Sequence, residues 1–442
     1  MMNWEKLLLP TSESGTGTEL YRSQFERDFD RIVFSAPFRN LQDKTQVFPL
    51  PESDFVHTRL THSLEVSSVG RSLGKSAGQF LIEKYSNLKQ KGVNSSDIGA
   101  IVAAAALAHD IGNPPFGHAG EEAISDFFRF HAYGKIWQDH LEEASWADLV
   151  AFEGNAQGFR MLLAKENGLN ISPAALAAFT KYPRPSLLKD KVSGRRSQKK
   201  YGFFSNDLTA FQALAESLGV HSCTQNSWLR HPLAFLVEAA DDICYSIIDL
   251  EDGCTLGLVP LDEVIALLAE IIGDRFSPQK LKAYPSPRQK LAIMRAMAIN
   301  QLVSETVAVF EREEENMLMG YFDSALTEMI PSAPILEKIS KLSVQKIYRS
   351  KQVLEKEAAG FQVIEGLLAC FSQAVYHFHF QKDRLSGQDK SILRLLPEDF
   401  APEKFSKPYP LLRALLDFIS GMTDKYALSL YRRVKGISLP GG

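Results

Sequence analysis

Cysteine is scarce in this sequence, and the few cysteines lie far apart. The 442 residues include only four, none in a CxxC pair: Cys223, Cys244, Cys254 and Cys370. So low a content argues against a disulfide framework and suits a reducing compartment. The N-terminus also lacks a basic segment followed by an apolar stretch and a cleavage site, and no run approaches the length of a membrane span. The sequence therefore predicts a cytoplasmic protein with no membrane partner.

Excess charge, strand patterns and the common phosphate-binding motifs are missing as well. The net charge is −4 and the sequence pI is about 6.2, so there is no global basic field and any nucleic-acid contact would be local. Few runs alternate between apolar and polar residues. Neither a P-loop GxxxxGK[ST] nor a Rossmann GxGxxG segment opening a helix after a strand is evident, which removes the commonest alternative nucleotide sites.

Apolar residues at helical spacing are abundant. One such segment begins at Ser286-Pro287, where a capping residue precedes a proline at the first helical position. The polar stretch 193–200 is the clearest loop, and no fixed-period repeat or long disordered linker interrupts the chain. We therefore predict an all-α protein in which residues 1–442 form a single compact body.

Two metal-type ligands stand at the end of a buried helix. The segment Ile101–Ala108 is apolar on every side and runs directly into His109 and Asp110. Pro114 and Pro115 cannot continue this helix, because proline lacks an N–H and clashes with the preceding turn. The two side chains are thus expected where the C-terminal end of the helix dipole favours a cation.

Two further segments offer ligands of the same kind. His62 opens an apolar-periodic helix, and Asp241 and Asp242 are adjacent carboxylates inside an otherwise apolar helical pattern. Buried carboxylates are costly unless a cation or a hydrogen-bond network satisfies them. The alternative is that these are unrelated polar residues satisfied within a helical core. For any one of these residues taken alone, the structural alternative and the metal site are equally favoured. Four such residues in these contexts, His62, His109, Asp110 and Asp241, favour a metal site.

His62, His109, Asp110 and Asp241 would supply two imidazoles and two carboxylates, which suit a divalent ion and leave positions open for water and phosphate oxygen. Manganese, magnesium, iron, cobalt and zinc all fit this ligand set. Several longer motifs accompany it in the sequence, and they are Leu41–Leu50, Thr58–Ser63, His109–His118, Phe152–Gly158, Lys181-Tyr182, Glu238–Asp252 and Ile419–Tyr426.

In their residues and in their order along the chain, these motifs resemble the HD-domain deoxynucleoside triphosphate triphosphohydrolases, and in particular the bacterial dGTP triphosphohydrolases (dGTPases). The resemblance spans most of the chain. It implies an HD-domain multi-helix phosphohydrolase fold, with an HD metal-binding core at about 55–255. A C-terminal helical part at about 256–442 would complete the substrate pocket and make the oligomer contacts.

The resemblance also implies residue roles. The metal ligands would be His62, His109, Asp110 and Asp241. His118 would be the acid/base residue beside the α-phosphate, and Glu121 would orient its imidazole. Without the motif, His118 would be read as a structural loop histidine.

Further residues match substrate-contact positions of the resembled family. The deoxyribose contacts would be Gln46, Val47, Tyr245 and Asp249. The phosphate contacts would be Arg59, Asn155, Lys181, Tyr182 and Lys200, which supply the converging donors that a triphosphate needs. Glu357 matches a purine contact and Arg413 a late arginine near the site. The loop 185–203 and the segment 378–407 match less closely, so no base-reading residue is transferred from them.

The predicted reaction is metal-dependent hydrolysis of a dNTP, with dGTP favoured, to deoxynucleoside and inorganic triphosphate. One alternative is an HD-type nucleotidase or phosphodiesterase, which would not need the sugar contacts. Another is a non-catalytic protein that binds nucleotides or single-stranded nucleic acid. The resemblance further implies a homo-oligomer such as a hexamer, and single-stranded DNA as a regulator.

Overall fold

The computed structural model describes residues 1–8, 22–46, 57–164, 167–398 and 400–438. Within these ranges the chain forms 21 α-helices and a single two-stranded antiparallel hairpin, so the all-α prediction is confirmed. The hairpin pairs β1 (Ser222–Thr224) with β2 (Ser227–Trp228).

The helices up to the hairpin are α1 (Trp4–Leu7), α2 (Gln24–Phe34), α3 (Ala36–Arg39), α4 (Arg59–Lys84), α5 (Ser86–Gln90), α6 (Ser95–Ala108), α7 (Gly117–Phe130), α8 (Ala132–Lys135), α9 (Glu143–Val150), α10 (Gly154–Leu163), α11 (Pro173–Phe179) and α12 (Leu208–Leu218). Those after it are α13 (Pro232–Thr255), α14 (Leu261–Ile272), α15 (Pro278–Lys282), α16 (Pro287–Met319), α17 (Ala333–Ser343), α18 (Lys351–Phe380), α19 (Gly387–Leu393), α20 (Pro408–Ser420) and α21 (Asp424–Val434). The helix predicted from Ser286-Pro287 is α16, and the Ser286 side chain caps it.

Small residues let α4 and α6 approach closely. A Cβ atom added at Gly70, Gly74 or Gly78 of α4 would lie 3.0 Å from an atom of α6. The nearest α6 residue moves from Ala106 to Ser95 as the numbering along α4 rises, so the two helices run antiparallel. This packing brings the first turn of α4 beside the last turn of α6, which are the ends that carry the predicted histidines.

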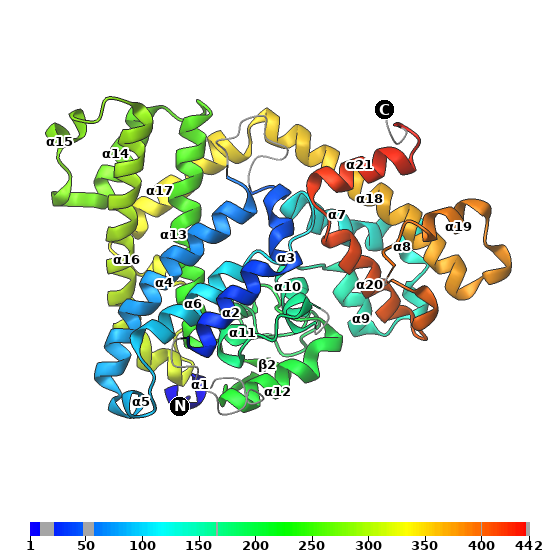
Figure 1. Ribbon diagram of the computed structural model, residues 1–442, viewed down its shortest axis with the longest axis horizontal. Coiled ribbons are helices and arrows are strands. Elements are labelled where there is room, and N and C mark those ends of the chain that lie inside the picture. The colour runs from blue at the N-terminus through cyan, green and yellow to red at the C-terminus, as the bar shows by residue number, and fades with distance from the viewer. Residues whose placement is uncertain (9–21, 47–56, 165–166, 399, 439–442) are drawn as a thin grey trace.

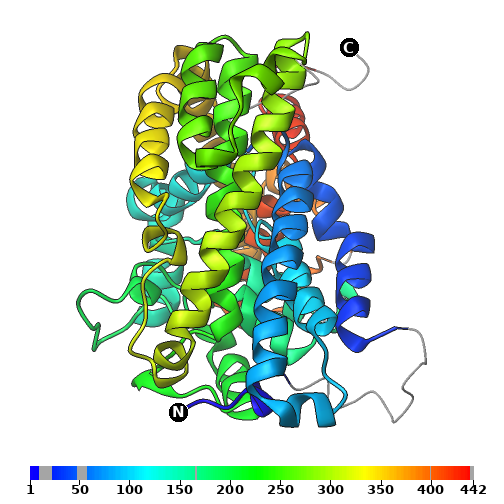
Figure 2. The ribbon, with the colours of Figure 1, turned by 90° about the vertical axis from the view of Figure 1, so that its left-hand side faces the viewer.

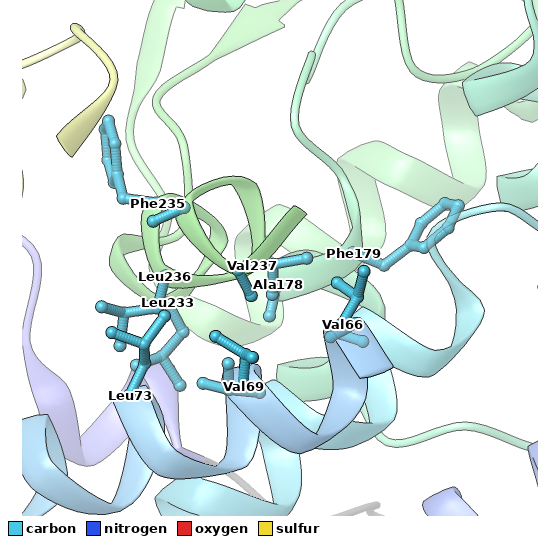
Figure 3. Close-up of a cluster of buried hydrophobic side chains, with 14 of the residues drawn as sticks. Val66, Val69, Leu73, Ala178, Phe179, Leu233, Phe235, Leu236 and Val237 are labelled. Carbon is cyan, nitrogen blue, oxygen red and sulfur yellow. The ribbon is translucent and has the colours of Figure 1, made fainter. Parts of the chain in front are cut away.

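The first hydrophobic core surrounds these helices. Helices α4, α13 and α16 run alongside one another in Figures 1 and 2. Figure 3 shows buried side chains of α4 and α13 together with those of α11, and the labelled residues are Val66, Val69, Leu73, Ala178, Phe179, Leu233, Phe235, Leu236 and Val237. Burying such side chains stabilises the fold by roughly 1.5–3 kcal/mol each, which fixes the helices that present the ligands.

A second core joins α7 to the C-terminal helices. Its buried residues come from α7, α9, α18, α20 and α21, which lie together on the right of Figure 1. Helices α14 and α16 belong to the first core although they follow residue 255. The two hydrophobic cores therefore do not follow the predicted division into an HD core at about 55–255 and a C-terminal part at about 256–442. That division stays a prediction.

The expectation that no segment approaches a membrane span is wrong for α18. Its residues Val353–Phe380 are long and apolar enough to cross a membrane, by length and composition only. Half of its most apolar window is buried inside the protein. Its fully buried residues include Ile364, Leu367 and Phe371, and they pack in the second core. These contacts are those of a core helix.

Candidate functional site

Three helices bring metal-type ligands together. His62 lies in the first turn of α4, His109 caps the C-terminus of α6, and Asp241 lies in the middle of α13. The Asp241 Oδ1 atom is 3.3 Å from His62 Nε2 and 3.4 Å from His109 Nε2. One ligand atom of each residue lies within 4.8 Å of the others. This spacing suits a single shared ion.

Hydrogen bonds orient the ligand atoms of His109 and Asp110. His109 Nδ1 lies 2.7 Å from the carbonyl oxygen of Ala106, and since a carbonyl only accepts, Nδ1 carries the proton and Nε2 keeps its lone pair. Asp110 Oδ1 accepts from Arg59 at 2.6 Å and from Asn113 at 2.7 Å. Asp110 Oδ2 is buried, has no hydrogen-bond partner among the described residues, and lies 3.6 Å from His109 Nε2.

The electrostatics of the cluster favour a cation. Burial alone would raise the pKa of Asp241, but Lys181 and the two imidazoles outweigh burial and hold this pKa well below its usual value. Burial likewise raises the pKa of Asp110, but Arg59 and the two imidazoles together outweigh burial and bring this pKa below its usual value. Two imidazole nitrogens, an ionised carboxylate and the orphaned oxygen of Asp110 therefore fit a divalent metal ion.

A histidine and glutamate pair lies at the start of α7. His118 Nδ1 is 2.7 Å from Glu121 Oε2, and Glu121 Oε1 accepts a 2.6 Å hydrogen bond from the Gly154 N–H. The His118 side chain is 80% exposed, whereas Glu121 is buried. Burial raises the pKa of Glu121, but the hydrogen bond with His118 and the positive charge of Lys200 bring it below its usual value. An ionised Glu121 fixes the His118 proton on Nδ1 and leaves Nε2 to act on a bound molecule.

Basic side chains line the same cavity from two sides. Lys181 Nζ lies 2.7 Å from Asp241 Oδ2, and Lys200 Nζ lies 3.0 Å from Glu153 Oε1. Burial lowers the pKa of each lysine, but the neighbouring carboxylates raise both above the usual value. Both lysines therefore remain charged and can donate to phosphate oxygens.

A polar and aromatic wall completes the cavity. The Tyr245 and Tyr348 rings stack with their centroids 5.7 Å apart, and the Tyr348 hydroxyl donates a 2.7 Å hydrogen bond to Asp249. Burial raises the pKa of Asp249 to about 7. Gln46 Oε1 is buried without a partner among the described residues. This wall offers stacking surface and unsatisfied hydrogen-bonding groups.

Together these groups enclose a cavity of about 480 Å³. His109 and Asp241 of the metal-type cluster, the His118 and Glu121 pair and the two lysines all border it, although they come from segments spread between residues 109 and 241. That combination supplies the groups that a metal-assisted hydrolysis of a phosphate ester uses: ligands for a metal, a proton donor and cations for the phosphates.

Comparisons with known proteins agree with this arrangement. The HD domain family model matches residues 59–152, and the phosphohydrolase-associated domain model matches residues 333–433. A deoxyguanosinetriphosphate triphosphohydrolase-like protein of Synechocystis sp. is 40% identical over 99% of this chain and 100% of its own. A protein of the same name from Pseudomonas aeruginosa is 39% identical over the same shares.

This chain belongs to the deoxyguanosinetriphosphate triphosphohydrolase-like family. The predicted resemblance is confirmed. A deoxyguanosinetriphosphate triphosphohydrolase of Salmonella arizonae is also similar, with 29% identity over 99% of this chain and 98% of its own. The protein is thus an HD-domain phosphohydrolase related to dGTPases, and its HD domain implies a divalent metal at the cluster of His62, His109 and Asp241.

Most of the site residues predicted for this dGTPase-like protein border the cavity. They are Gln46, Arg59, His109, Asp110, His118, Glu121, Asn155, Lys181, Tyr182, Lys200, Asp241, Tyr245 and Glu357. His62 and Asp249 lie one layer behind this lining, through their contacts with Asp241 and Tyr348. Val47 lies outside the described residues.

Arg413 is not brought to the cavity lining. It is 1% exposed, and its guanidinium lies 3.5 Å from the centroid of the Phe204 ring while hydrogen-bonding to Gln157. The sequence motif placed this arginine near the site, but the packing places it inside the core between α10 and α20. Its role as a substrate contact stays a prediction that the geometry does not support.

Sequence reasoning missed Tyr348 and Glu153 as members of the cavity wall. Tyr348 ends a π-helical turn, Val344–Tyr348, in a stretch without a recognised motif. Glu153 was visible inside the Phe152–Gly158 motif, and its oxygen accepts hydrogen bonds from both Lys200 and Asn155. Its place close to Asn155 in this motif was the available signal.

Proposed function

We propose that this protein hydrolyses deoxynucleoside triphosphates, with dGTP as the preferred substrate, to deoxynucleoside and inorganic triphosphate. One observation carries the proposal: a single cavity is bordered by His109 and Asp241 of the metal-type cluster, by the His118 and Glu121 pair and by Lys181 and Lys200. The names of the full-length relatives favour the same reaction.

His118 acts on the 5′-oxygen side of the scissile bond. Water attacks the α-phosphorus, the bond between phosphorus and the 5′-oxygen breaks, and the imidazolium donates its Nε2 proton to the departing 5′-oxygen. Glu121 keeps the other ring proton on Nδ1 and stabilises the imidazolium form. Triphosphate then leaves in one piece, and the proton lost by the attacking water balances the proton that His118 gave.

The metal would be held by His62, His109, Asp110 and Asp241. When bound, a divalent ion polarises an α-phosphate oxygen and lowers the pKa of a coordinated water. Manganese, magnesium, iron, cobalt and zinc remain the proposed candidates. Arg59 donates a hydrogen bond to Asp110 and so orients this ligand. This role is distinct from the phosphate contact that is also proposed for Arg59.

The remaining wall residues select the substrate. Lys181, Lys200 and Asn155 donate to the β- and γ-phosphates, whose negative charge they offset while the triphosphate is held in place. Gln46 accepts from the 3′-hydroxyl with its orphaned oxygen, since a buried oxygen without a donor is costly. The Tyr245 ring fills the space that a 2′-hydroxyl would need, which favours DNA precursors over GTP.

The test is to incubate the purified, metal-loaded protein with each of the four dNTPs and with GTP, and to resolve the products by chromatography. We expect deoxyguanosine and intact triphosphate from dGTP and little reaction with GTP. A His118→Ala preparation is the control for contaminating phosphatases. Release of dGMP and pyrophosphate would assign another reaction class and contradict the proposal.

We also retain the homo-oligomer, such as a hexamer, the single-stranded DNA regulator and the cytoplasmic location as proposals. Light scattering after size-exclusion chromatography tests the first. Activity measured with and without a single-stranded oligonucleotide tests the second.

A further inference from the structure

A buried carboxylate near the C-terminus reaches the loop that carries His118. Asp424, the first residue of α21, is 1% exposed. Its Oδ1 accepts a 2.9 Å hydrogen bond from the Phe116 N–H, and its Oδ2 accepts a 3.0 Å bond from the Thr45 N–H and a further bond from the Thr45 hydroxyl. One side chain therefore joins three distant parts of the chain.

A buried ammonium group makes a second connection to the same loop. Lys44 Nζ donates 2.6 Å hydrogen bonds to the carbonyl oxygens of Asn113 and Ser420. Asn113 and Phe116 bracket the two prolines of the loop, so Lys44 and Asp424 hold its two ends. A buried lysine is costly unless such bonds satisfy it, so the two carbonyl oxygens hold the Lys44 ammonium group in place.

The loop needs such support because its backbone is unfavourable. Phe116 adopts φ +63°, in the left-handed region that side chains other than glycine rarely enter. A conformation of this kind costs about 1–3 kcal/mol and persists only where the surroundings over-determine it. The Phe116 ring also packs on α18, where a Cβ at Gly360 would lie 2.8 Å from its Cγ.

The strained turn leads directly to His118. Gly117 follows it with φ +58°, and a Cβ there would lie 2.7 Å from Arg59 Nη2, so the turn fits closely against the phosphate-side arginine. Thr45 in turn is followed by Gln46, and an isolated bridge pairs Thr45 with Thr58, directly before α4. The contacts of Asp424 thus end one residue from Gln46 and two residues from His118.

We propose that Lys44 and Asp424 are positioning residues that hold the turn 113–117 and Thr45, so that His118 and Gln46 face the substrate. The inference rests on the proposed function of His118. We call this pair, Lys44 and Asp424 with the bonds above, the loop clamp. It assigns to the phosphohydrolase-associated region, residues 333–433, a part in the chemistry of the HD domain.

The test compares Asp424→Asn with Asp28→Asn. Asp28 is a matched control: it is also fully buried and accepts a 3.1 Å bond from a distant backbone N–H, that of Ser172, but Ser172 does not line the cavity, whereas Thr45 and Phe116 do. We expect Asp424→Asn to lower kcat for dGTP by about 100-fold, the cost of misplacing a catalytic group by about 1 Å. Asp28→Asn should stay within about twofold of the wild type in kcat, whatever it does to stability.

A double-mutant cycle separates positioning from stability. In a His118→Ala background, Asp424→Asn should change kcat by no more than about twofold, since the group it positions is gone. Asp424→Asn should also change KM, because Thr45 no longer holds Gln46 in place, and this effect on KM should persist in the His118→Ala background. Loss of kcat that is equally large with and without His118, in protein that is folded and metal-loaded, would overturn the inference.

Amide hydrogen exchange gives a readout independent of activity. In Asp424→Asn the amides of Thr45 and Phe116 should lose their protection, while that of Ser172 keeps it. Unchanged protection at both sites would overturn the clamp. If Asp424→Asn does not fold, Lys44→Met carries the same cycle, because methionine fills the space of the buried side chain. A wild type inactive on every dNTP contradicts the proposed function, whereas an active wild type with fully active clamp variants contradicts the clamp alone.

Discussion

The two halves of the catalytic cavity are built in different ways. The metal-type ligands lie on α4, α6 and α13, long helices of the first core, and their geometry follows from helix packing. His118 instead follows a strained turn beside the second core, and its loop is held by Asp424, which lies 308 positions from Phe116, and by Lys44. The positions of the metal ligands are therefore set by packed helices, whereas the position of His118 depends on a loop that a few side chains hold.

This difference separates metal binding from proton transfer. Changes in the ligand half should remove the metal and activity together. Changes in the acid/base half should leave the metal in place and reduce turnover. The predictions below test that separation, beginning with the largest expected effect.

The largest effect is expected from Asp241→Asn, compared with Asp242→Asn. The two carboxylates are adjacent on α13, but Asp241 contacts both imidazoles while Asp242 accepts a 2.7 Å bond from Thr327. Asp241→Asn should lose the metal and all measurable turnover, because an anionic ligand is gone. Asp242→Asn should keep its metal. Elemental analysis of the two purified variants checks this, and equal metal contents would break the comparison.

His118→Ala should keep its metal and still bind dNTP, but turnover should fall by roughly two to four orders of magnitude, the range for a positioned acid/base group. The exposed His140, which contacts Phe380 outside the cavity, supplies the control variant His140→Ala. Metal content, calorimetric dNTP binding and turnover are measured on the same preparation. Metal loss in His118→Ala would make this residue a ligand and erase the distinction between the halves.

Glu121→Gln should have a smaller effect than His118→Ala. The amide retains an acceptor for the Gly154 N–H but removes the negative charge that stabilises the His118 imidazolium. We expect turnover to fall by roughly tenfold to 100-fold, as for other partners that orient a functional imidazole. The double variant should be little slower than His118→Ala. Fully additive losses in steady-state rates would show that Glu121 acts independently.

The smallest effect concerns the stability of the first core at acid pH. His231 is buried, with Nε2 donating to the Leu7 carbonyl and Nδ1 accepting from the Leu233 N–H, and burial lowers its pKa to about 4. The unfolded chain, with an ordinary pKa near 6.5, binds the proton first, so stability is lost as pH falls from about 6.5 toward 4. The loss reaches roughly 3 kcal/mol.

Denaturant unfolding at pH 7, 5.5 and 4.5 measures this loss, with His231→Asn as the reference because it caps α13 without titrating. The wild type should lose more stability than the variant over this range. If the wild type and His231→Asn lose the same free energy of unfolding over this pH range, His231 is not the group responsible.

The ligand half could be predicted from the sequence because each ligand has a local signature. An all-apolar helix runs into His109 and Asp110, and adjacent carboxylates interrupt a buried helix at Asp241. The pair Ser286-Pro287 likewise predicted the capped start of α16. Helical periodicity could not give the pairing of α4 with α6, which depends on glycines spaced four apart meeting a complementary face.

The acid/base half could be predicted only by resemblance. Nothing local to Pro114–His118 indicates that Asp424 and Lys44 hold it, because those contacts exist only after the second core forms. Arg413 shows the opposite case, since a motif near the site carries a side chain that the fold turns into the core. Tyr348 has no motif and reaches Asp249 from a π-helical turn. Such residues depend on the tertiary structure and leave no pattern in the sequence.

The most direct test of the account is hydrolysis of dGTP in ¹⁸O-labelled water with the metal-loaded wild type, followed by mass spectrometry of both products. If water attacks the α-phosphorus while His118 protonates the 5′-oxygen, one ¹⁸O atom appears in triphosphate and none in deoxyguanosine. Label in deoxyguanosine, or label found only in dGMP, pyrophosphate or single phosphate, would contradict it.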